Sequence, residues 1–377
     1  MRTRKLVTVG HSYVVSLNRR LAHEMAIAGR GEWEVTCIAP RYFHGGHDLA
    51  PLTLDPSPND AYVLEAIPAY LTSHVHVFSY GAKLRSLLNQ PWDLVHAWEE
   101  PYVLAGWEIS HWAHAASKLV YRSAQSNPKR YPPPFSWFEQ RSMARACGWI
   151  CSGASVEQNL LARKGYDRPH LLSPLGVDVQ FFKPDAGQRT RAFHELGWRS
   201  DGPPVIGFSG RLVPAKGLTL LMQALDACTE PWRALFLGAG QMELELRKWS
   251  ARYGDNVRIL RVPHDAVPSY MNAMDILCAP SQTTPAWREQ FGRMLVEAFA
   301  CGVPVIGSNS GEIANVVGKA GVIVDENDVA GWTHAIQNLL SSPEKRRELG
   351  ESGLELARSR YTWPVIAREY LSFFETL

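Results

Sequence analysis

Short runs of apolar and β-branched residues alternate with longer helical patterns along the whole chain. In the first half, the runs that predict strands are KLVTV (5–9), EVTCIA (34–39), DLVHAW (93–98), SKLVY (117–121) and GWICSG (148–153). The second half has its own series: PVIGFSG (204–210), RALFLGAG (233–240), VRILRV (257–262), DILCAPS (275–281), VPVIGS (303–308) and GVIV (321–324). Strands that alternate with helices are typical of α/β folds with mostly parallel sheets. The pattern therefore predicts two α/β halves.

A polar, proline-bearing stretch that ends in WRSDGPP separates the two series. We therefore expect one α/β domain over residues 1–180, a linker over 181–204 and a second α/β domain over 205–360. The chain ends with SPEKRRELGESGLELARSR and then YTWPVIAREYLSFFETL, which predict two successive helices with no strand between them. The last of these, over 361–377, is expected to pack away from the second sheet.

Composition agrees with a two-domain globular protein and excludes several classes. The chain has 377 residues, of which 46% are hydrophobic and 20% charged, and chains of this length usually form more than one domain. The formal net charge of +2 gives no indication of nucleic-acid binding. No apolar run approaches the twenty residues of a transmembrane helix, and the first run is too short for a signal peptide.

The six cysteines are scattered, and their spacing fits neither a zinc site nor a redox pair. We interpret them as buried, reduced thiols, which favours a reducing compartment, namely the cytoplasm.

The first motif with residues suited to ligand binding is GFSGRLVPAKG, residues 207–217. It leaves a predicted strand through Gly210 and presents Arg211 and Lys216 on a loop before a helix. An arginine fork and a lysine point charge suit a pair of phosphates. Two solvated loop cations are the alternative interpretation.

The second motif is REQFGRMLVEAFACG, residues 288–302. We expect a helix to begin near Gly292, so that its first N–H groups and positive dipole end can receive a phosphate. Glu289 then precedes the helix, and Glu297 lies on it more than a turn further in. Carboxylates accept hydrogen bonds from sugar hydroxyls, so the two glutamates can reach different parts of one nucleotide sugar.

These segments together resemble the retaining glycosyltransferases of family 4, a GT-B family within the glycosyl transferases group 1. The similarity rests on SPLGVDVQFF, GFSGRLVPAKG, LFLGAGQMELEL, VPSYMNAMDILCAPS, EQFGRMLVEAFACGVPVIGSNSGEI and AGVIVDENDVAGW, in the order of the family. It covers residues 173–332 strongly and the first half more loosely. The resemblance implies two Rossmann-like α/β domains facing each other across a cleft, with the last helix crossing back to the first domain.

The resemblance also implies residue roles. Glu289, Arg211 and Lys216 are the expected catalytic residues: the glutamate contacts donor-sugar hydroxyls, and the two cations hold the diphosphate. Glu297 is expected to bind the nucleotide ribose. The other expected donor-binding residues are Gly10, Gly210, Val262, Gln290, Phe291, Gly292 and Arg293.

The sequence departs from the family at the end of its fourth strand. Many members carry His-x-His or His-Glu-Pro there, facing the reacting sugar, whereas this chain reads HAWEEPY. His96 remains, Trp98 or Glu99 takes the second position, and Glu100 follows. We therefore expect His96, Glu99 and Glu100 near the acceptor or the reacting sugar, with the role of the family's histidine left open.

The resulting hypothesis is a retaining transfer of a sugar from a nucleotide diphosphate, with UDP or GDP as the carrier, to a hydroxyl of a glycan, a lipid-linked or a small-molecule acceptor. No Asp-x-Asp triplet occurs, so we expect no metal and no other cofactor. Alternatives are a nucleotide-sugar 2-epimerase of the same fold and a non-catalytic sugar-nucleotide-binding protein. The expected location is the cytoplasm, with transient contact at the inner face of the membrane. The acceptor, the linkage and the oligomeric state stay open.

Overall fold

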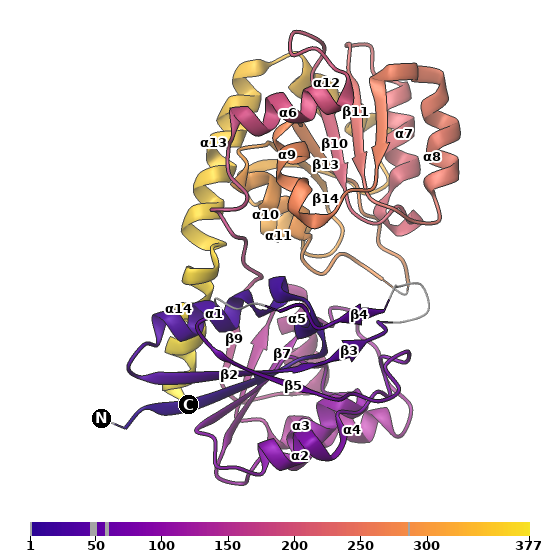
Figure 1. Cartoon of the computed structure of the whole chain (residues 1–377). Coiled ribbons are helices and arrows are strands. Elements are labelled where there is room, and N and C mark those ends of the chain that lie inside the picture. The colour runs from indigo at the N-terminus through magenta and orange to yellow at the C-terminus, as the bar shows by residue number, and fades with distance from the viewer. Residues whose placement is uncertain (1, 46–50, 57–59, 286) are drawn as a thin grey trace. The chain divides into compact units, whose positions relative to one another are not determined.

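The structure, a computed structural model, describes residues 2–45, 51–56, 60–285 and 287–377. The chain forms two compact units: the first is Met1–Pro174 together with Trp363–Leu377, and the second is Leu175–Thr362. Figure 1 shows that each unit is a sheet flanked by helices.

The first unit contains a seven-stranded sheet in the order β5-β2-β1-β6-β7-β8-β9, and all neighbouring strands are parallel. Its strands are β1 (Arg4–Val9), β2 (Trp33–Pro40), β5 (Val63–Ile67), β6 (Leu94–Ala97), β7 (Lys118–Ser123), β8 (Gly148–Cys151) and β9 (His170–Leu172), and a small antiparallel pair is formed by β3 (Tyr42–Phe43) and β4 (Leu52–Thr53).

The helices of this unit are α1 (Arg20–Ala28), α2 (Gly81–Leu88), α3 (Leu104–Trp112), α4 (Phe135–Arg145), α5 (Ala154–Gln158) and α14 (Trp363–Thr376), with short turns η1 (His11–Val14), η2 (Ser16–Arg19) and η3 (Asn159–Arg163). The C-terminal helix α14 packs against α1. Seven of its residues are buried, among them Tyr370 and Phe374. Burial of this apolar face explains why the last helix belongs to the first unit.

The second unit contains a six-stranded parallel sheet in the order β12-β11-β10-β13-β14-β15. Its strands are β10 (Val205–Ser209), β11 (Arg233–Leu237), β12 (Val257–Leu260), β13 (Ile276–Ala279), β14 (Val305–Ser308) and β15 (Gly321–Val324). Its helices are α6 (Ala186–Leu196), α7 (Leu218–Asp226), α8 (Glu243–Ser250), α9 (Val267–Asn272), α10 (Arg293–Ala300), α11 (Ile313–Val317), α12 (Val329–Leu340) and α13 (Pro343–Arg360), with turns η4 (Pro214–Lys216), η5 (Ala251–Asn256) and η6 (His264–Ala266).

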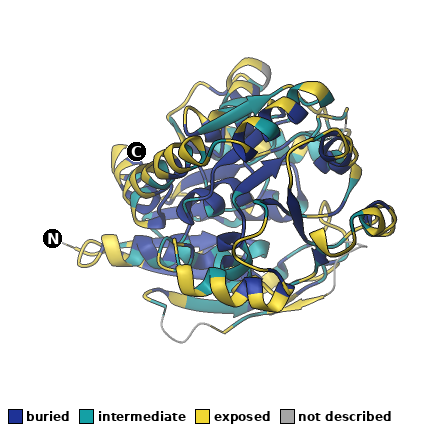
Figure 2. Cartoon of the chain, turned by 90° about the horizontal axis from the view of Figure 1, so that it is seen from above, coloured by how far each residue is buried: buried dark blue, intermediate teal, exposed yellow. Residues whose placement is uncertain are grey.

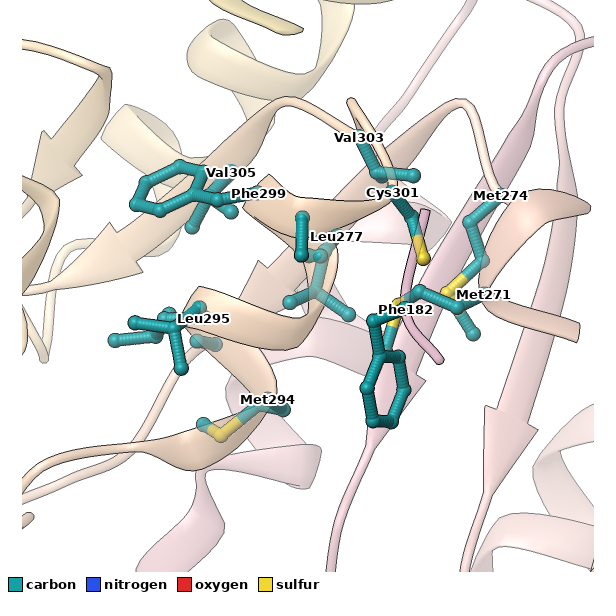
Figure 3. Packing of buried hydrophobic residues seen from close by; sticks show 14 of the residues in the cluster. Phe182, Met271, Met274, Leu277, Met294, Leu295, Phe299, Cys301, Val303 and Val305 are labelled. Atoms are coloured by element: carbon teal, nitrogen blue, oxygen red, sulfur yellow. The ribbon is translucent and has the colours of Figure 1, made fainter. Parts of the chain in front are cut away.

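The second sheet has an apolar core on each face. In β11, Leu235 and Leu237 belong to one cluster of buried side chains, and Ala234 and Phe236 belong to the other. Successive side chains of a strand point to opposite faces, so a parallel strand that is buried on both faces is apolar at most of its positions. Figure 3 shows the first cluster, in which Leu277 of β13 packs among methionine and phenylalanine side chains. In Figure 2 the central strands are accordingly buried, the edge strand β15 is intermediate, and the outer helix faces are exposed.

Each strand predicted from the sequence is confirmed, but the structure differs over residues 181–204. This segment is built into the second unit and contains α6. Asp185 caps the helix by accepting a hydrogen bond from the backbone N–H of Gln188, and Gly197 ends it with φ of +69°. Phe193 on its inner face is buried. Caps and an apolar face therefore make this proline-flanked stretch part of the fold rather than a linker.

Candidate functional site

The second sheet has a switch point between β10 and β13. From β10 the chain continues to β11 and β12 on one side, whereas β13 is followed by β14 and β15 on the other. The loops after β10 and β13 diverge from this point at the carboxyl edge, where open α/β sheets bind their ligands. Both sequence motifs fall on these loops: residues 210–217 follow β10, and residues 280–292 follow β13.

The two loops are in direct contact. The backbone N–H of Gln282 donates to the carbonyl of Ala215 over 2.8 Å. Gly217 has φ of +69°, and a Cβ atom there would lie 1.8 Å from the carbonyl oxygen of Pro280. Only glycine allows this approach, which brings Lys216 beside the second loop.

Lys216 and Glu289 form a buried ion pair at this contact. The Nζ atom of Lys216 bonds Oε2 of Glu289, and the hydroxyl of Ser281 donates to the same oxygen over 2.9 Å. The two side chains are 11% and 8% exposed. Lys216 Nζ also lies 4.9 Å from the ring centroid of Trp287. The structure therefore joins a residue from each sequence motif, and the pairing is held by a hydroxyl and an aromatic face that the sequence did not indicate.

The loop that follows β14 holds the backbone of Glu289 in place. Its carbonyl accepts from the N–H of Glu312 over 3.0 Å. Gly311 has φ of +56°, and a Cβ atom there would lie 2.0 Å from the same carbonyl oxygen. The glycine lets the two loops approach each other and so holds the carboxylate of Glu289 in one position.

Helix α10 begins directly after these groups. Gly292 precedes it with φ of +80° and no side chain caps its first turn, so the first N–H groups are available to a ligand. Phe291 is buried and packs edge-to-face on Tyr361. Gln290 is exposed, and the Arg293 side chain is 40% exposed. The helix start was predicted at this glycine and is confirmed.

Glu297 lies in the second turn of α10 and not at the ion pair. Its side chain is 12% exposed, and Oε1 lies 3.9 Å from Nε of Arg293. Burial raises the pKa of Glu297, and the Arg293 charge opposes this rise. In the part of the chain that the structure describes, this carboxylate has no hydrogen-bond partner, so it can accept hydrogen bonds from hydroxyl donors.

The remaining residues of the second unit lie at the same sheet edge without touching the ion pair. Gly210 ends β10 with φ of +153°, and its N–H donates to Leu237 of β11 over 2.9 Å. Arg211 is exposed, and its guanidinium has no hydrogen-bond or ion-pair partner within the described ranges. Val262 follows the edge strand β12 and packs partly buried on the core.

The first sheet has an equivalent switch point between β1 and β6. Gly10 follows β1, and Glu99 and Glu100 follow β6, so these three expected residues do share one sheet edge. A Cβ atom at Gly10 would lie 3.1 Å from that of Trp98. The loops after the two strands are therefore closely packed.

His96 lies inside the first unit rather than at the edge. It is fully buried on β6, where its Nδ1 shares a hydrogen bond of 2.9 Å with the hydroxyl of Thr8. The rings of Tyr370 and Phe374 from α14 pack against it. Burial lowers the pKa of His96 to about 3, with a contribution from the Arg122 charge. The structure therefore places His96 as a neutral core residue and not as a contact for a bound sugar.

The two glutamates after β6 point to different partners. Glu100 accepts from the hydroxyl of Ser123 over 2.7 Å and from the N–H of Ala124 over 2.8 Å, and burial raises its pKa. Glu99 is 3% exposed and bonds the imidazole of His11 over 2.7 Å. Sequence reasoning missed His11, although its position directly after Gly10 at the end of a predicted strand was a usable signal.

The described residues contain neither a metal-binding cluster nor a membrane-spanning helix. In the ranges given above, no group of three or more His, Cys, Asp or Glu side chains is arranged to hold a metal ion. No helix in that part of the chain is both long and apolar enough to span a bilayer.

Comparison with known sequences assigns the chain to one family. The sequence model of the family Glycosyl transferases group 1 matches residues 191–355. A D-inositol 3-phosphate glycosyltransferase from Corynebacterium jeikeium is 31% identical over 383 residues, which is 95% of this chain and 85% of the relative. A GDP-mannose-dependent alpha-(1-6)-phosphatidylinositol monomannoside mannosyltransferase from Mycolicibacterium smegmatis is 34% identical over 50% of this chain and 52% of its own length.

Solved structures give the same result for the fold. The Anabaena protein HepE, determined in complex with UDP and glucose, superposes with a TM-score of 0.75 at 19% identity, over 99% of this chain and 100% of that chain. Similarity at this identity shows the fold alone. The fold expected from the sequence, an α/β chain of the GT-B class, is confirmed.

Proposed function

This chain belongs to the glycosyl transferases group 1 and is a glycosyltransferase that uses a nucleotide-sugar donor, and we propose that it is a retaining, metal-independent member of family 4. The observation that supports this most is the Lys216–Glu289 pair at the switch point of the second sheet, next to the open N-terminus of α10. These groups supply a cation, a carboxylate and free backbone donors on neighbouring loops. That combination fits a sugar joined to a diphosphate.

In the proposed reaction the acceptor oxygen bonds to the anomeric carbon on the face from which the phosphate oxygen leaves. The glycosidic C–O bond breaks, and the acceptor proton passes to the departing phosphate oxygen. The protein positions the reactants and stabilises the developing charges. Lys216 and Arg211 hold the diphosphate, assisted by N–H groups from Phe291 to Arg293.

The carboxylates have separate proposed tasks. Glu289, fixed by Ser281 and by the backbone of Glu312, accepts hydrogen bonds from hydroxyls of the transferred sugar. Glu297 accepts from the ribose, and the segment at Val262 meets the base. Gly210 allows the backbone of the second unit to approach the phosphates. UDP and GDP are the proposed carriers, because one structural relative was solved with UDP and one sequence relative is named for GDP-mannose.

The acceptor is proposed to carry a free hydroxyl. The names of both sequence relatives contain an inositol derivative, so inositol phosphates are the first acceptors to assay. All six cysteines are unpaired thiols, which supports a reducing compartment such as the cytoplasm, with transient contact at the inner membrane face when the acceptor is lipid-linked.

A thermal-shift panel of UDP-, GDP-, ADP- and dTDP-sugars tests donor binding. A donor at one hundred times its dissociation constant should stabilise the protein by about 2.7 kcal/mol. Arg211→Met should remove this shift without lowering the basal melting temperature, because Arg211 is exposed and has no partner in the described part of the chain. Arg199→Met, which changes an arginine with an 85% exposed side chain, is the matched control. A shift that survives in Arg211→Met would contradict the assigned phosphate contact.

Turnover assays distinguish glycosyl transfer from the two alternative functions, a nucleotide-sugar 2-epimerase and a non-catalytic binding protein. They also test whether the reaction needs a metal ion. A 2-epimerase would convert the nucleotide sugar into its C2 epimer without net release of UDP or GDP, and a binding protein would leave the nucleotide sugar unchanged. Glycosyl transfer predicts release that depends on the acceptor. Activity should survive EDTA, because the cations and helix N-terminus neutralise the diphosphate. Loss of activity in EDTA with rescue by Mn²⁺ or Mg²⁺ would refute metal independence.

A further inference from the structure

The ammonium group of Lys216 is held from two sides within the second unit. One side is the carboxylate of Glu289, which the ammonium bonds through Oε2. The other side is the indole ring of Trp287, whose centroid lies 4.9 Å from Nζ of Lys216. An aromatic face attracts a cation through its quadrupole and carries no net charge. The ring of Trp287 therefore holds the lysine without cancelling its positive charge.

The ring of Trp287 has its place independently of the ion pair, because its loop is hydrogen-bonded at several points. The N–H of Thr284 donates to the carbonyl of Trp287 over 2.7 Å, and the N–H of Trp287 donates to the carbonyl of Thr284 over 3.2 Å. The neighbouring Thr283 donates its N–H to Oε2 of Glu326 over 2.6 Å. Its hydroxyl shares a hydrogen bond of 3.0 Å with the hydroxyl of Ser310. These contacts anchor the loop to the segments that follow β14 and β15.

The ion pair leaves hydrogen-bonding groups over for a ligand. The hydrogen bonds from Lys216 and Ser281 both end on Oε2 of Glu289, and within the described ranges Oε1 accepts none. An ammonium has three donors, of which Glu289 occupies one. When sugar hydroxyls bind Glu289 and phosphate oxygens approach Lys216, the flexible four-carbon stem lets the ammonium move. An aromatic face beside the ammonium restricts that movement.

We propose that Trp287 is a positioning residue for the donor diphosphate, with its ring keeping the ammonium of Lys216 in place while the phosphate oxygens of the nucleotide sugar bind it. This inference rests on the proposed glycosyltransferase function. Trp287 stands directly before the second sequence motif and was not among the expected donor-binding residues. Because the ring serves the ligand of the phosphates and not that of the sugar, UDP and GDP alone are sufficient probes.

Two substitutions separate the aromatic face from apolar bulk at this half-buried position. Trp287→Phe keeps a ring beside Lys216, whereas Trp287→Leu keeps an apolar side chain without an aromatic face. We expect Trp287→Leu to weaken the binding of UDP and of GDP by roughly 3- to 30-fold in titration calorimetry. Trp287→Phe should recover part of that loss.

Tyr253→Leu is the matched control for loss of an aromatic ring that faces a cation. Tyr253 also belongs to the second unit, and the guanidinium carbon of Arg252 lies 5.5 Å from its ring centroid. Neither residue is part of the two loops that carry the ion pair. The control should therefore leave the dissociation constants of UDP and GDP unchanged.

A double-mutant cycle tests whether Trp287 acts through Lys216. The Lys216→Met protein has no ammonium to hold, so adding Trp287→Leu to it should change the affinity for UDP by less than about twofold. A ring that only fills space, or that contacts the nucleotide itself, would weaken binding by the same factor in both backgrounds. That result would overturn the proposal.

Fluorine NMR gives a readout that does not depend on the double variant. The chain has 13 tryptophans, and the 5-fluorotryptophan signal of Trp287 is the one that is missing from Trp287→Phe. Titration with UDP should shift this signal, because the ammonium beside the ring exchanges a carboxylate for phosphate oxygens. The shift should be smaller in Lys216→Met.

The inference and the proposed function can fail separately. A signal of Trp287 that stays in place at saturating UDP, or unchanged affinities for UDP and GDP in Trp287→Leu, would overturn the role of Trp287 while the proposed function stands. Failure of the unmodified protein to bind any nucleoside diphosphate or nucleotide sugar would overturn the proposed function, and this inference with it.

Discussion

Replacement of Glu289 by glutamine should reduce stability and activity through different contacts. Removing one charge of a buried ion pair costs about 3–5 kcal/mol. The side chains of Lys216 and Glu289 are still 11% and 8% exposed to solvent. The amide oxygen of a glutamine at position 289 can also still accept hydrogen bonds from Ser281 and Lys216. We therefore expect a loss of about 2 kcal/mol in the free energy of unfolding, measured by urea denaturation.

The same substitution should lower kcat strongly while the donor KM changes little. The transferred sugar gains positive charge as its glycosidic bond breaks, and a neutral amide cannot stabilise that charge as a carboxylate does. We expect a decrease of roughly 100-fold, equivalent to about 2.7 kcal/mol. Glu245→Gln, at an exposed position of α8, is the control for a glutamate of the same unit.

A double variant distinguishes the two effects. Lys216→Met alone leaves Glu289 charged and unpaired, so it should be destabilising as well. Lys216→Met combined with Glu289→Gln removes both charges and should recover stability to within about 1 kcal/mol of the unmodified protein. Activity should stay lost. If Glu289→Gln keeps a normal kcat, or if the two stability losses simply add, the reasoning about this pair is wrong.

Three further predictions address other parts of the molecule. Glu297→Gln should raise the donor KM by roughly 5- to 100-fold with little change in kcat, because ribose contacts are equal in ground and transition states; a loss of kcat at unchanged KM would contradict this. Phe374→Ala, which removes a ring that is 2% exposed, should destabilise the first unit by about 3–5 kcal/mol in urea, and an unchanged midpoint would refute the docking role of α14. Burial lowers the pKa of His96 from 6.5 to about 3, so the unfolded chain binds a proton below pH 6.5 that the folded chain does not, and stability falls by about 2 kcal/mol at pH 5. His96→Asn should lack that acid-side loss in urea titrations, and an equal loss in both proteins would contradict it.

Most of the sheet architecture was predictable because the central parallel strands are buried on both faces and are apolar at most of their positions. The two strands missed in the first sheet lack this signal. β5 is an edge strand that carries Glu65 and is largely half-buried, and β9 has only three residues. Edge strands need fewer apolar residues, so their pattern is weaker.

The motifs of the second unit were predictable for a similar local reason: a strand, a glycine and a helix start are adjacent in sequence. The contact between Lys216 and Glu289 was not predictable from the sequence, because it depends on how closely the loops approach each other at Gly217 and Gly311. In the first unit, the sequence could not distinguish a core histidine from a site histidine. His96 is enclosed by Tyr370 and Phe374 of α14, which lie far from it along the chain.

Transfer of a sugar from a nucleotide diphosphate with retention of configuration can be followed directly. UDP-glucose and GDP-mannose, both α-configured and labelled with ¹³C at the anomeric carbon, can be incubated with the enzyme and D-inositol 3-phosphate or related inositol acceptors, and the product followed by NMR. A retaining glycosyltransferase should give acceptor-dependent release of UDP or GDP and an α-linked product. A β-linked product would contradict it.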